Sequence, residues 1–141
     1  TLRLAYGQVK GYEENGQKIP SQTTFAGLYQ RWADQQGREP FDLPPRWLQR
    51  RKALNPATPF NFISTADIIG GNSGSPVVNR AGEFVGIIFD GNLQSLVLDF
   101  YFTDHQARAL AVHSSAIIEA LQKVYGARGL ATELTSGKRK S

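Results

Sequence analysis

Hydrophobic and polar residues alternate at the start of the chain. Residues 2–6 place Leu2, Leu4 and Tyr6 between polar or small side chains, and this period of two predicts a half-buried strand. Gly7 is typical of a bulge, after which we expect the strand to resume over residues 9–12. Asn15-Gly16 then predicts a tight turn. The chain therefore begins with β structure.

Three helices are predicted from hydrophobic spacing and from end signals. Hydrophobic residues recur at helical spacing over residues 25–32, with Thr23 or Thr24 as cap and Gly37 as the end. A short basic helix over residues 47–54 follows a proline-rich bridge. The last predicted helix begins at Ser114 or Ser115, has one hydrophobic face and ends at Gly126.

Most of the second half of the chain is predicted as strand. Short apolar or alternating runs give five candidate strands, at residues 60–64, 75–78, 83–89, 96–102 and 107–112. The second and third are joined by a hairpin turn with Gly82 in the left-handed conformation. Short strands with a closing helix predict a mainly β fold, a β-barrel with one or two short helices before residue 60 and a C-terminal helix.

Length and composition limit the possible classes. The 141 residues suit one domain, which we place at residues 1–134, followed by a basic flexible tail at 135–141. No cysteine is present, which excludes disulfides, thiolate catalysis and zinc–cysteine sites. No run of about 20 apolar residues predicts a membrane span. The chain begins with Thr1 and lacks methionine, so we expect it to be a piece of a longer protein.

The net charge of +4 raises the possibility of nucleic-acid binding. Basic residues cluster at 46–52 and at the C-terminus. No aromatic platform or nucleic-acid motif accompanies them, so a solvated helix face with a basic tail is the favoured interpretation. We expect no nucleic-acid partner, no cofactor and no metal ion.

The segment Gly70–Pro76 carries the candidate chemistry. Ser73 stands among glycines that allow a tight turn, and β-branched residues follow the closing proline. This pattern is typical of a serine-peptidase nucleophile loop, in which the Gly71 and Ser73 amides would bind the oxyanion of a tetrahedral intermediate. The Ser73 hydroxyl would attack after a histidine removes its proton, yet no histidine precedes Ser73.

Two catalytic patterns and one inactive alternative are open for this loop. An α/β-hydrolase elbow would take an aspartate (Asp90, Asp99 or Asp104) and then His105 or His113, but no βαβ alternation surrounds the serine. A chymotrypsin-type serine would open a hairpin of a second barrel and take its histidine and aspartate from elsewhere. His105 and His113 would then be bystanders. The third possibility is a glycine-rich turn in an inactive binding or structural module.

Four segments resemble the S46 peptidases, the bacterial dipeptidyl peptidases 7 and 11. They are Leu4–Tyr12, Ser64–Pro76, Gly86–Asn92 and the region Ala116–Leu134. The resemblance covers nearly the whole chain except its basic tail. It implies the C-terminal β-barrel of a chymotrypsin-like double β-barrel, with a missing N-terminal barrel and a helical domain as partners within the parent chain.

The resemblance also implies a function for the parent protein. S46 members release dipeptides from free peptide N-termini, act in the periplasm or at the bacterial cell surface, and form homodimers. The family's histidine and aspartate have no counterparts here, so we expect the isolated fragment to be inactive.

Four residues fall on functional positions of the family. Ser73 matches the nucleophile and Gly71, with the Ser73 amide, the oxyanion hole. Asp90 matches a carboxylate that holds the substrate α-ammonium. Gly91 lies where the acid-preferring branch carries arginine, which favours the type 7 branch and hydrophobic P1 side chains in a roomy pocket. Asp67 lies six residues before Ser73, where trypsin-like enzymes place a pocket acid, but we interpret it as structural.

Overall fold

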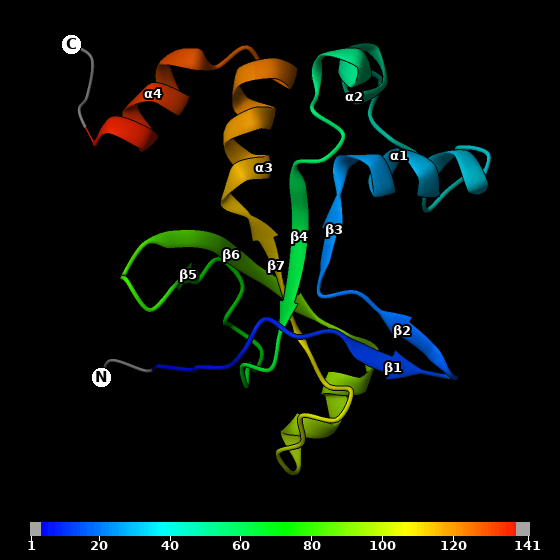
Figure 1. Cartoon of the computed structure of the whole chain (residues 1–141), viewed down its shortest axis with the longest axis vertical. Coiled ribbons are helices and arrows are strands. Elements are labelled where there is room, and N and C mark those ends of the chain that lie inside the picture. Colours follow the sequence, from blue (N-terminus) through cyan, green and yellow to red (C-terminus); the bar gives the residue numbers. More distant parts are fainter. Residues whose placement is uncertain (1–3, 138–141) are drawn as a thin grey trace. The chain divides into compact units, whose positions relative to one another are not determined.

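A computed structural model describes residues 4–137 of the chain. The described residues divide into two compact units, one made of residues 4–23 and 61–114 and the other of residues 24–60 and 115–137. The first unit carries most of the strands, and the second carries helices α1, α2 and α4 with most of α3 (Figure 1). Each unit has its own hydrophobic cluster, and the candidate site lies in the first.

An antiparallel arrangement dominates the five-stranded sheet, whose order is β3-β4-β7-β6-β5. Its strands are β3 (Gln22–Thr24), β4 (Pro59–Ser64), β5 (Pro76–Val78), β6 (Phe84–Gly91) and β7 (Ala109–His113). The pairings β4–β7, β6–β7 and β5–β6 are antiparallel. A separate hairpin joins β1 (Tyr12–Glu14) to β2 (Gln17–Ile19) through the predicted Asn15-Gly16 turn, where both residues have positive φ.

The first unit has a small core built around β6 and β7. Phe62, Ile88, Ala109 and Ala111 are buried together. A Cβ on Gly86 would lie 2.5 Å from the Val112 oxygen and 2.7 Å from the Phe62 ring. Small residues at the centre of the sheet therefore let the Phe62 ring lie close against the backbone of β6.

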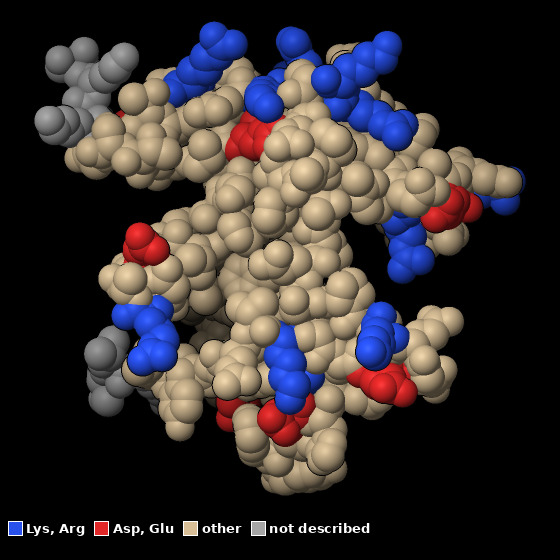
Figure 2. Space-filling model, in the orientation of Figure 1, with Lys and Arg blue, Asp and Glu red and all other residues tan. Residues whose placement is uncertain are grey.

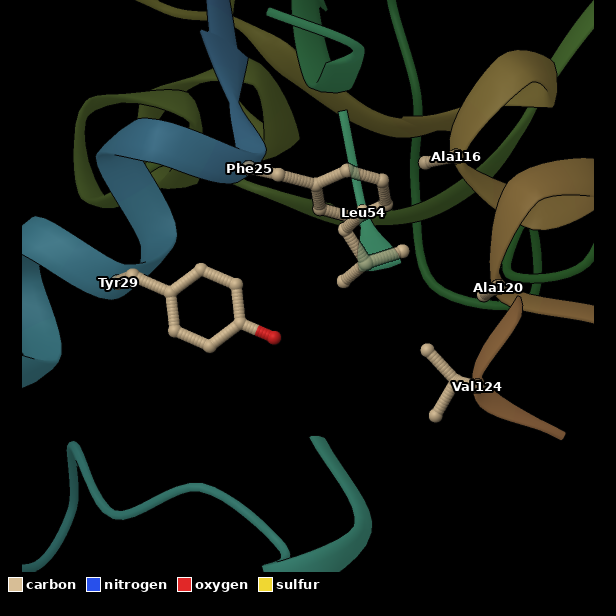
Figure 3. Packing of buried hydrophobic residues seen from close by; sticks show 6 residues of the cluster. All are labelled: Phe25, Tyr29, Leu54, Ala116, Ala120 and Val124. Atoms are coloured by element: carbon tan, nitrogen blue, oxygen red, sulfur yellow. The ribbon is translucent and has the colours of Figure 1, made fainter. Parts of the chain in front are cut away.

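The second unit packs its helices around aromatic residues. It contains α1 (Phe25–Asp34), α2 (Pro45–Arg50), the 3₁₀ turn η1 (Arg51–Ala53), the π-helical turn η3 (Ala120–Val124), α4 (Arg128–Ser136) and nearly all of α3 (Ser114–Glu119). Six buried side chains form its core (Figure 3), namely Phe25, Tyr29, Leu54, Ala116, Ala120 and Val124. The predicted first helix is confirmed, and the Thr24 hydroxyl caps it by accepting the Gly27 amide at 3.3 Å.

Two predicted strands are wrong, and the described sheet does not form the predicted barrel. Residues 96–102 do not form a strand, because Leu93–Asp99 is the 3₁₀ helix η2. With that strand absent, the described sheet ends at β3 and β5 and does not close into a barrel. Residues 4–8 form no strand, and residues 1–3 lie outside the described part. Gly7 permits a close backbone approach, since a Cβ there would lie 2.3 Å from the Ala66 nitrogen.

The C-terminal region holds one helix that the sequence did not predict. Gly126 has φ 68° and follows η3, as expected for a helix end. The chain then continues as α4 through Ser136, which includes the first residues of the predicted tail. The division at residue 134 stays a prediction, and residues 138–141 lie outside the described part. Within residues 4–137, no helix combines the length and hydrophobicity that a membrane crossing requires.

Glu119 of α3 fixes the loop before β4. Its carboxylate accepts the Asn55 amide at 2.6 Å, the Lys123 ammonium at 2.7 Å and the Thr58 hydroxyl. Burial alone would raise the pKa of Glu119, but these hydrogen bonds and the Lys123 charge outweigh it and lower the pKa below its ordinary value. The loop is therefore bound to the ionised form of the carboxylate.

We expect Glu119→Gln to lower the free energy of local opening of this loop by about 1–3 kcal/mol, because hydrogen bonds to a charged group are lost. Because the pKa of Glu119 is lowered in the folded protein, the contribution of its carboxylate to stability is fully present above the ordinary glutamate pKa. This contribution is lost as the pH falls through the lowered pKa. Hydrogen exchange of residues 55–58 in the full-length protein measures this, with Glu13→Gln on the exposed face of β1 as control. Equal protection in both variants at neutral pH would contradict the prediction.

Candidate functional site

The segment between β4 and β5 forms the serine loop, residues 69–75. Asn72 shapes it: its side-chain oxygen accepts the Ile69 amide at 2.8 Å, its amide donates to the Ile69 oxygen at 3.2 Å, and its carbonyl accepts the Ser75 amide at 3.0 Å. Gly71 and Gly74 have φ values of 93° and 90°, which only glycine adopts without strain. The sequence thus folds into the turn predicted from its glycines.

The serine loop is bonded directly to β6. The Gly74 amide donates to the Ile88 oxygen at 2.8 Å, and the Ile88 amide donates to the Ser75 oxygen at 3.0 Å. Ser73 is exposed, and its hydroxyl donates to the Phe89 oxygen at 3.1 Å. The hydroxyl proton therefore points to a backbone carbonyl, and a base from outside the described residues would have to displace this bond to activate the oxygen.

The amides of Gly71 and Ser73 are available to a ligand. Within residues 4–137, neither amide donates a hydrogen bond to a protein acceptor. Both residues are exposed. Unpaired amides in a tight turn are the groups that an oxyanion hole requires. Their convergence on one point stays a prediction.

A pocket of about 200 Å³ lies beside Ser73. Its walls come from the serine loop and the residues before it, the end of β6, and η2. The lining residues are Ile68, Ile69, Gly70, Asn72, Ser73, Ile88, Phe89, Asp90, Gly91, Ser95, Leu96 and Asp99. The lining combines apolar side chains with polar ones, includes two carboxylates, and contains neither lysine, arginine nor histidine.

The structure brings Asp90 and Gly91 to this pocket with Ser73. They end β6, after a register shift between Ile88 and Asp90. The Asp90 carboxylate is exposed and accepts the Gly91 amide at 2.8 Å. The space beside Gly91 is partly filled, because a Cβ there would lie 2.2 Å from the Ser95 hydroxyl oxygen. The pocket therefore has less free space beside Gly91 than the sequence predicts, because Ser95 occupies part of it.

Two residues that the sequence analysis did not single out hold this end of the pocket. Asn92 exchanges two hydrogen bonds with Arg108: its amide donates to the Arg108 oxygen at 3.0 Å, and its side-chain oxygen accepts the Arg108 amide at 2.8 Å. The Arg108 side chain is almost wholly buried and donates to the carbonyls of Lys10, Gly11, Asp104 and Ala107. The one sequence signal for this role was an arginine among the apolar residues of the predicted strand 107–112.

The remaining candidates do not join the pocket. His105 and Asp67 are exposed, and neither lines it. His113 lies on β7 opposite Gly86, edge-on to the Phe62 ring at 5.8 Å, and burial lowers its pKa. Neither histidine lines the pocket, and the Ser73 hydroxyl donates to the Phe89 oxygen. Within residues 4–137, no three histidine, aspartate or glutamate side chains are grouped as a metal site would require.

The α/β-hydrolase alternative is wrong. Strand β5 follows Ser73 where an elbow would place a helix. The strands around the loop pair antiparallel, as β5–β6 and β6–β7 show. The serine lies on a turn between strands, as the chymotrypsin-type pattern predicts.

Comparison with solved structures finds this fold in dipeptidyl peptidases. DPP11 of Porphyromonas endodontalis, in complex with the dipeptide Arg-Glu, matches 96% of this chain with a TM-score of 0.83 and 26% identity. The match uses 20% of that chain. A second structure of the same DPP11 gives a TM-score of 0.80 over 93% of this chain.

Sequence comparison shows the family. The chain is 34% identical to dipeptidyl-peptidase 7 of Phocaeicola vulgatus over 96% of its length, and 31% identical to the Asp/Glu-specific dipeptidyl-peptidase of Shewanella putrefaciens over 95%. It spans about a fifth of the length of these relatives. The Peptidase S46 profile matches residues 1–136, and the chain belongs to the peptidase S46 family. The resemblance seen in the sequence is thereby confirmed.

Proposed function

We propose that this chain supplies the nucleophile half of a dipeptidyl peptidase active site. The observation that carries the proposal is the placement of Ser73 and the Asp90-Gly91 end of β6 around one pocket, with the Gly71 and Ser73 amides in the same serine loop. Ser73 attacks the scissile carbonyl and forms an acyl-enzyme. The amides of Gly71 and Ser73 stabilise the oxyanion.

The base and its orienting acid come from another part of the parent protein. The pocket lining contains no histidine, and the Ser73 hydroxyl is bonded to a carbonyl. A serine without a positioned base is a weak nucleophile, so the isolated chain is inactive. Its partners are the missing N-terminal barrel and the helical domain of the parent protein. The open sheet of this chain and the N-terminal barrel together form a chymotrypsin-like catalytic domain. The parent protein is a homodimer in the periplasm or at the cell surface.

Asp90 holds the α-ammonium of the substrate. The carboxylate lines the pocket and keeps a defined orientation through the Gly91 amide. A charge-assisted bond to a free N-terminus would select against blocked peptides, because these lack the ammonium group that the carboxylate binds. The substrates are peptides with free N-termini, and each turnover releases a dipeptide.

The P1 side chain is hydrophobic. Ile68, Ile88, Phe89 and Leu96 line the pocket, and Asp90 and Asp99 would repel an acidic side chain. The relatives include both dipeptidyl-peptidase 7 and Asp/Glu-specific enzymes, so the preference follows from this chain's own residues.

We expect the full-length protein to cleave dipeptidyl substrates with P1 Phe or Leu about tenfold to a hundredfold faster than those with P1 Asp, measured as kcat/KM. Burial of one large apolar side chain is worth roughly 1.5–3 kcal/mol, which sets this range. Matched substrates with P1 Phe, Asp and Lys provide the comparison. P1 Asp in the lead would contradict the proposed preference. P1 Lys in the lead would mean that an acidic residue determines the P1 preference: Asp90 or Asp99 of the lining, or Asp67 from a position outside this pocket.

The second candidate function is an inactive binding module. The bond from the Ser73 hydroxyl to the Phe89 oxygen favours it, because this arrangement lacks an activated nucleophile. The full-length protein decides between the two, since a module would bind peptides without releasing dipeptides.

A further inference from the structure

The space beside Gly91 is occupied by a residue of another element. Ser95 lies in η2, and its hydroxyl oxygen is 2.2 Å from the position of a Cβ on Gly91. Its own Cβ is 3.2 Å from that position. A contact below 3 Å requires that one group move, so no side chain fits at residue 91 while Ser95 keeps its place. Gly91 and Ser95 both line the pocket next to Ser73.

Hydrogen bonds keep Ser95 in this place. Its hydroxyl donates to the Asn92 oxygen at 2.6 Å, and its amide donates to the same oxygen at 2.9 Å. Asn92 in turn is bonded to Arg108 and donates from its side chain to the Gln106 oxygen at 2.7 Å. Rotation of the Ser95 hydroxyl away from residue 91 would break the bond to Asn92, and its Cβ would still crowd the position.

We propose that Ser95 is a specificity-determining residue that acts together with Gly91. Its hydroxymethyl group forms part of the pocket wall, and it decides whether residue 91 can carry a side chain into the pocket. The proposal rests on the proposed function, since it takes this pocket as the P1 site. The substrate class that it concerns is peptides with a large apolar P1 side chain.

Graded replacements at residue 95 make the proposal measurable. Ser95→Ala removes the atom 2.2 Å away and leaves the one at 3.2 Å, whereas Ser95→Gly removes both. The destabilisation caused by Gly91→Ala should therefore be largest in the unmodified protein, smaller with Ser95→Ala and smallest with Ser95→Gly. Ser95→Gly alone should widen the pocket by a hydroxymethyl group and favour larger P1 side chains.

The first measurement is the thermal stability of the full-length protein. We expect Gly91→Ala to lower the Tm by at least about 2 °C, and expect the loss to shrink stepwise when it is combined with Ser95→Ala or Ser95→Gly. Gly129→Ala is the matched control, because its Cβ would meet nothing within 4 Å and Gly129 lies in helix α4. A Tm loss for Gly91→Ala that is the same in all three backgrounds would overturn the proposal.

The second measurement is kcat/KM for free-amine dipeptidyl substrates with P1 Ala, Leu and Phe. We expect Ser95→Gly to raise the Phe to Ala ratio by about tenfold, the effect of a small volume change in the pocket that holds the P1 side chain. If the Tm loss of Gly91→Ala depends on residue 95 but the Phe to Ala ratio of kcat/KM does not change, the specificity role of Ser95 is overturned. Continued dipeptide release would then leave the proposed function intact. Failure of the unmodified protein to cleave any of the three would overturn the proposed function instead.

Discussion

Ser73→Ala is expected to lower kcat/KM of the full-length protein for free-amine dipeptidyl substrates by about 10⁴-fold to 10⁶-fold, the usual loss when the attacking atom is removed. The fold should persist, because Ser73 is exposed and, within residues 4–137, its side chain makes one hydrogen bond, to the Phe89 oxygen of β6. Initial rates with a fluorogenic dipeptidyl substrate measure the loss.

Ser75→Ala is the matched control for this variant. Ser75 lies two residues further along, and its backbone joins the serine loop to β6 through Asn72 and Ile88. It does not line the pocket. Activity within about threefold of the unmodified protein is expected for this control, the range usual for substitutions away from the site. An active Ser73→Ala variant would remove Ser73 from the chemistry.

Asp90→Asn is expected to lower kcat/KM for peptides with a free N-terminus by about 30-fold to 1000-fold, which corresponds to about 2–4 kcal/mol for a lost charge-assisted pair. Asparagine keeps a side-chain oxygen that can accept the Gly91 amide, now bonded to Asp90 at 2.8 Å. The change therefore removes charge with little change of shape. Turnover of N-acetylated peptides should be low in both proteins.

Asp99→Asn is the matched control, because it tests whether the loss in Asp90→Asn comes from a direct contact with the substrate ammonium or from the negative charge of the pocket as a whole. Asp99 is the other carboxylate of the lining, and it lies at the end of η2. Its neutralisation should change kcat/KM far less than that of Asp90. A larger loss for Asp99→Asn, or equal turnover of free and blocked peptides, would contradict the assignment of the α-ammonium to Asp90.

The serine loop could be predicted from the sequence because its signals are local. Glycines at residues 71 and 74 adopt the left-handed conformation, and Asn72 bonds only to residues within three positions of itself. The pairing of β5 with β6 follows from the turn between them, where Gly82 has φ 79°. Such features depend on backbone chemistry that adjacent residues determine.

The segment after β6 could not be predicted because its hydrophobic pattern does not reflect burial. Leu96, Leu98, Phe100 and Phe102 alternate with other residues as in a strand, yet the side chains of Leu96, Phe100 and Phe102 are between 62% and 88% exposed. Alternation predicts a strand only where one face is covered. The residues of η2 form 3₁₀ turns instead, and these turns place Ser95 beside Gly91.

The role of Arg108 beside the pocket also could not be predicted from the sequence pattern. Arg108 stands among alanines of a predicted strand, and its guanidinium is buried against carbonyls from residues 10 and 11. Burial lowers its pKa, while Asp104 and Tyr12 oppose this effect. These contacts join residues nearly a hundred positions apart, and periodicity carries no information at that distance.

The most direct test of the account is the position of the covalent adduct that a fluorophosphonate probe forms with the full-length protein. A serine nucleophile displaces fluoride and keeps the phosphonate on its oxygen, and peptide mapping then locates the modified residue. The account predicts one adduct on Ser73, absent in Ser73→Ala and retained in Ser75→Ala. An adduct on a different residue, or dipeptide release by a protein that the probe does not modify, would contradict it.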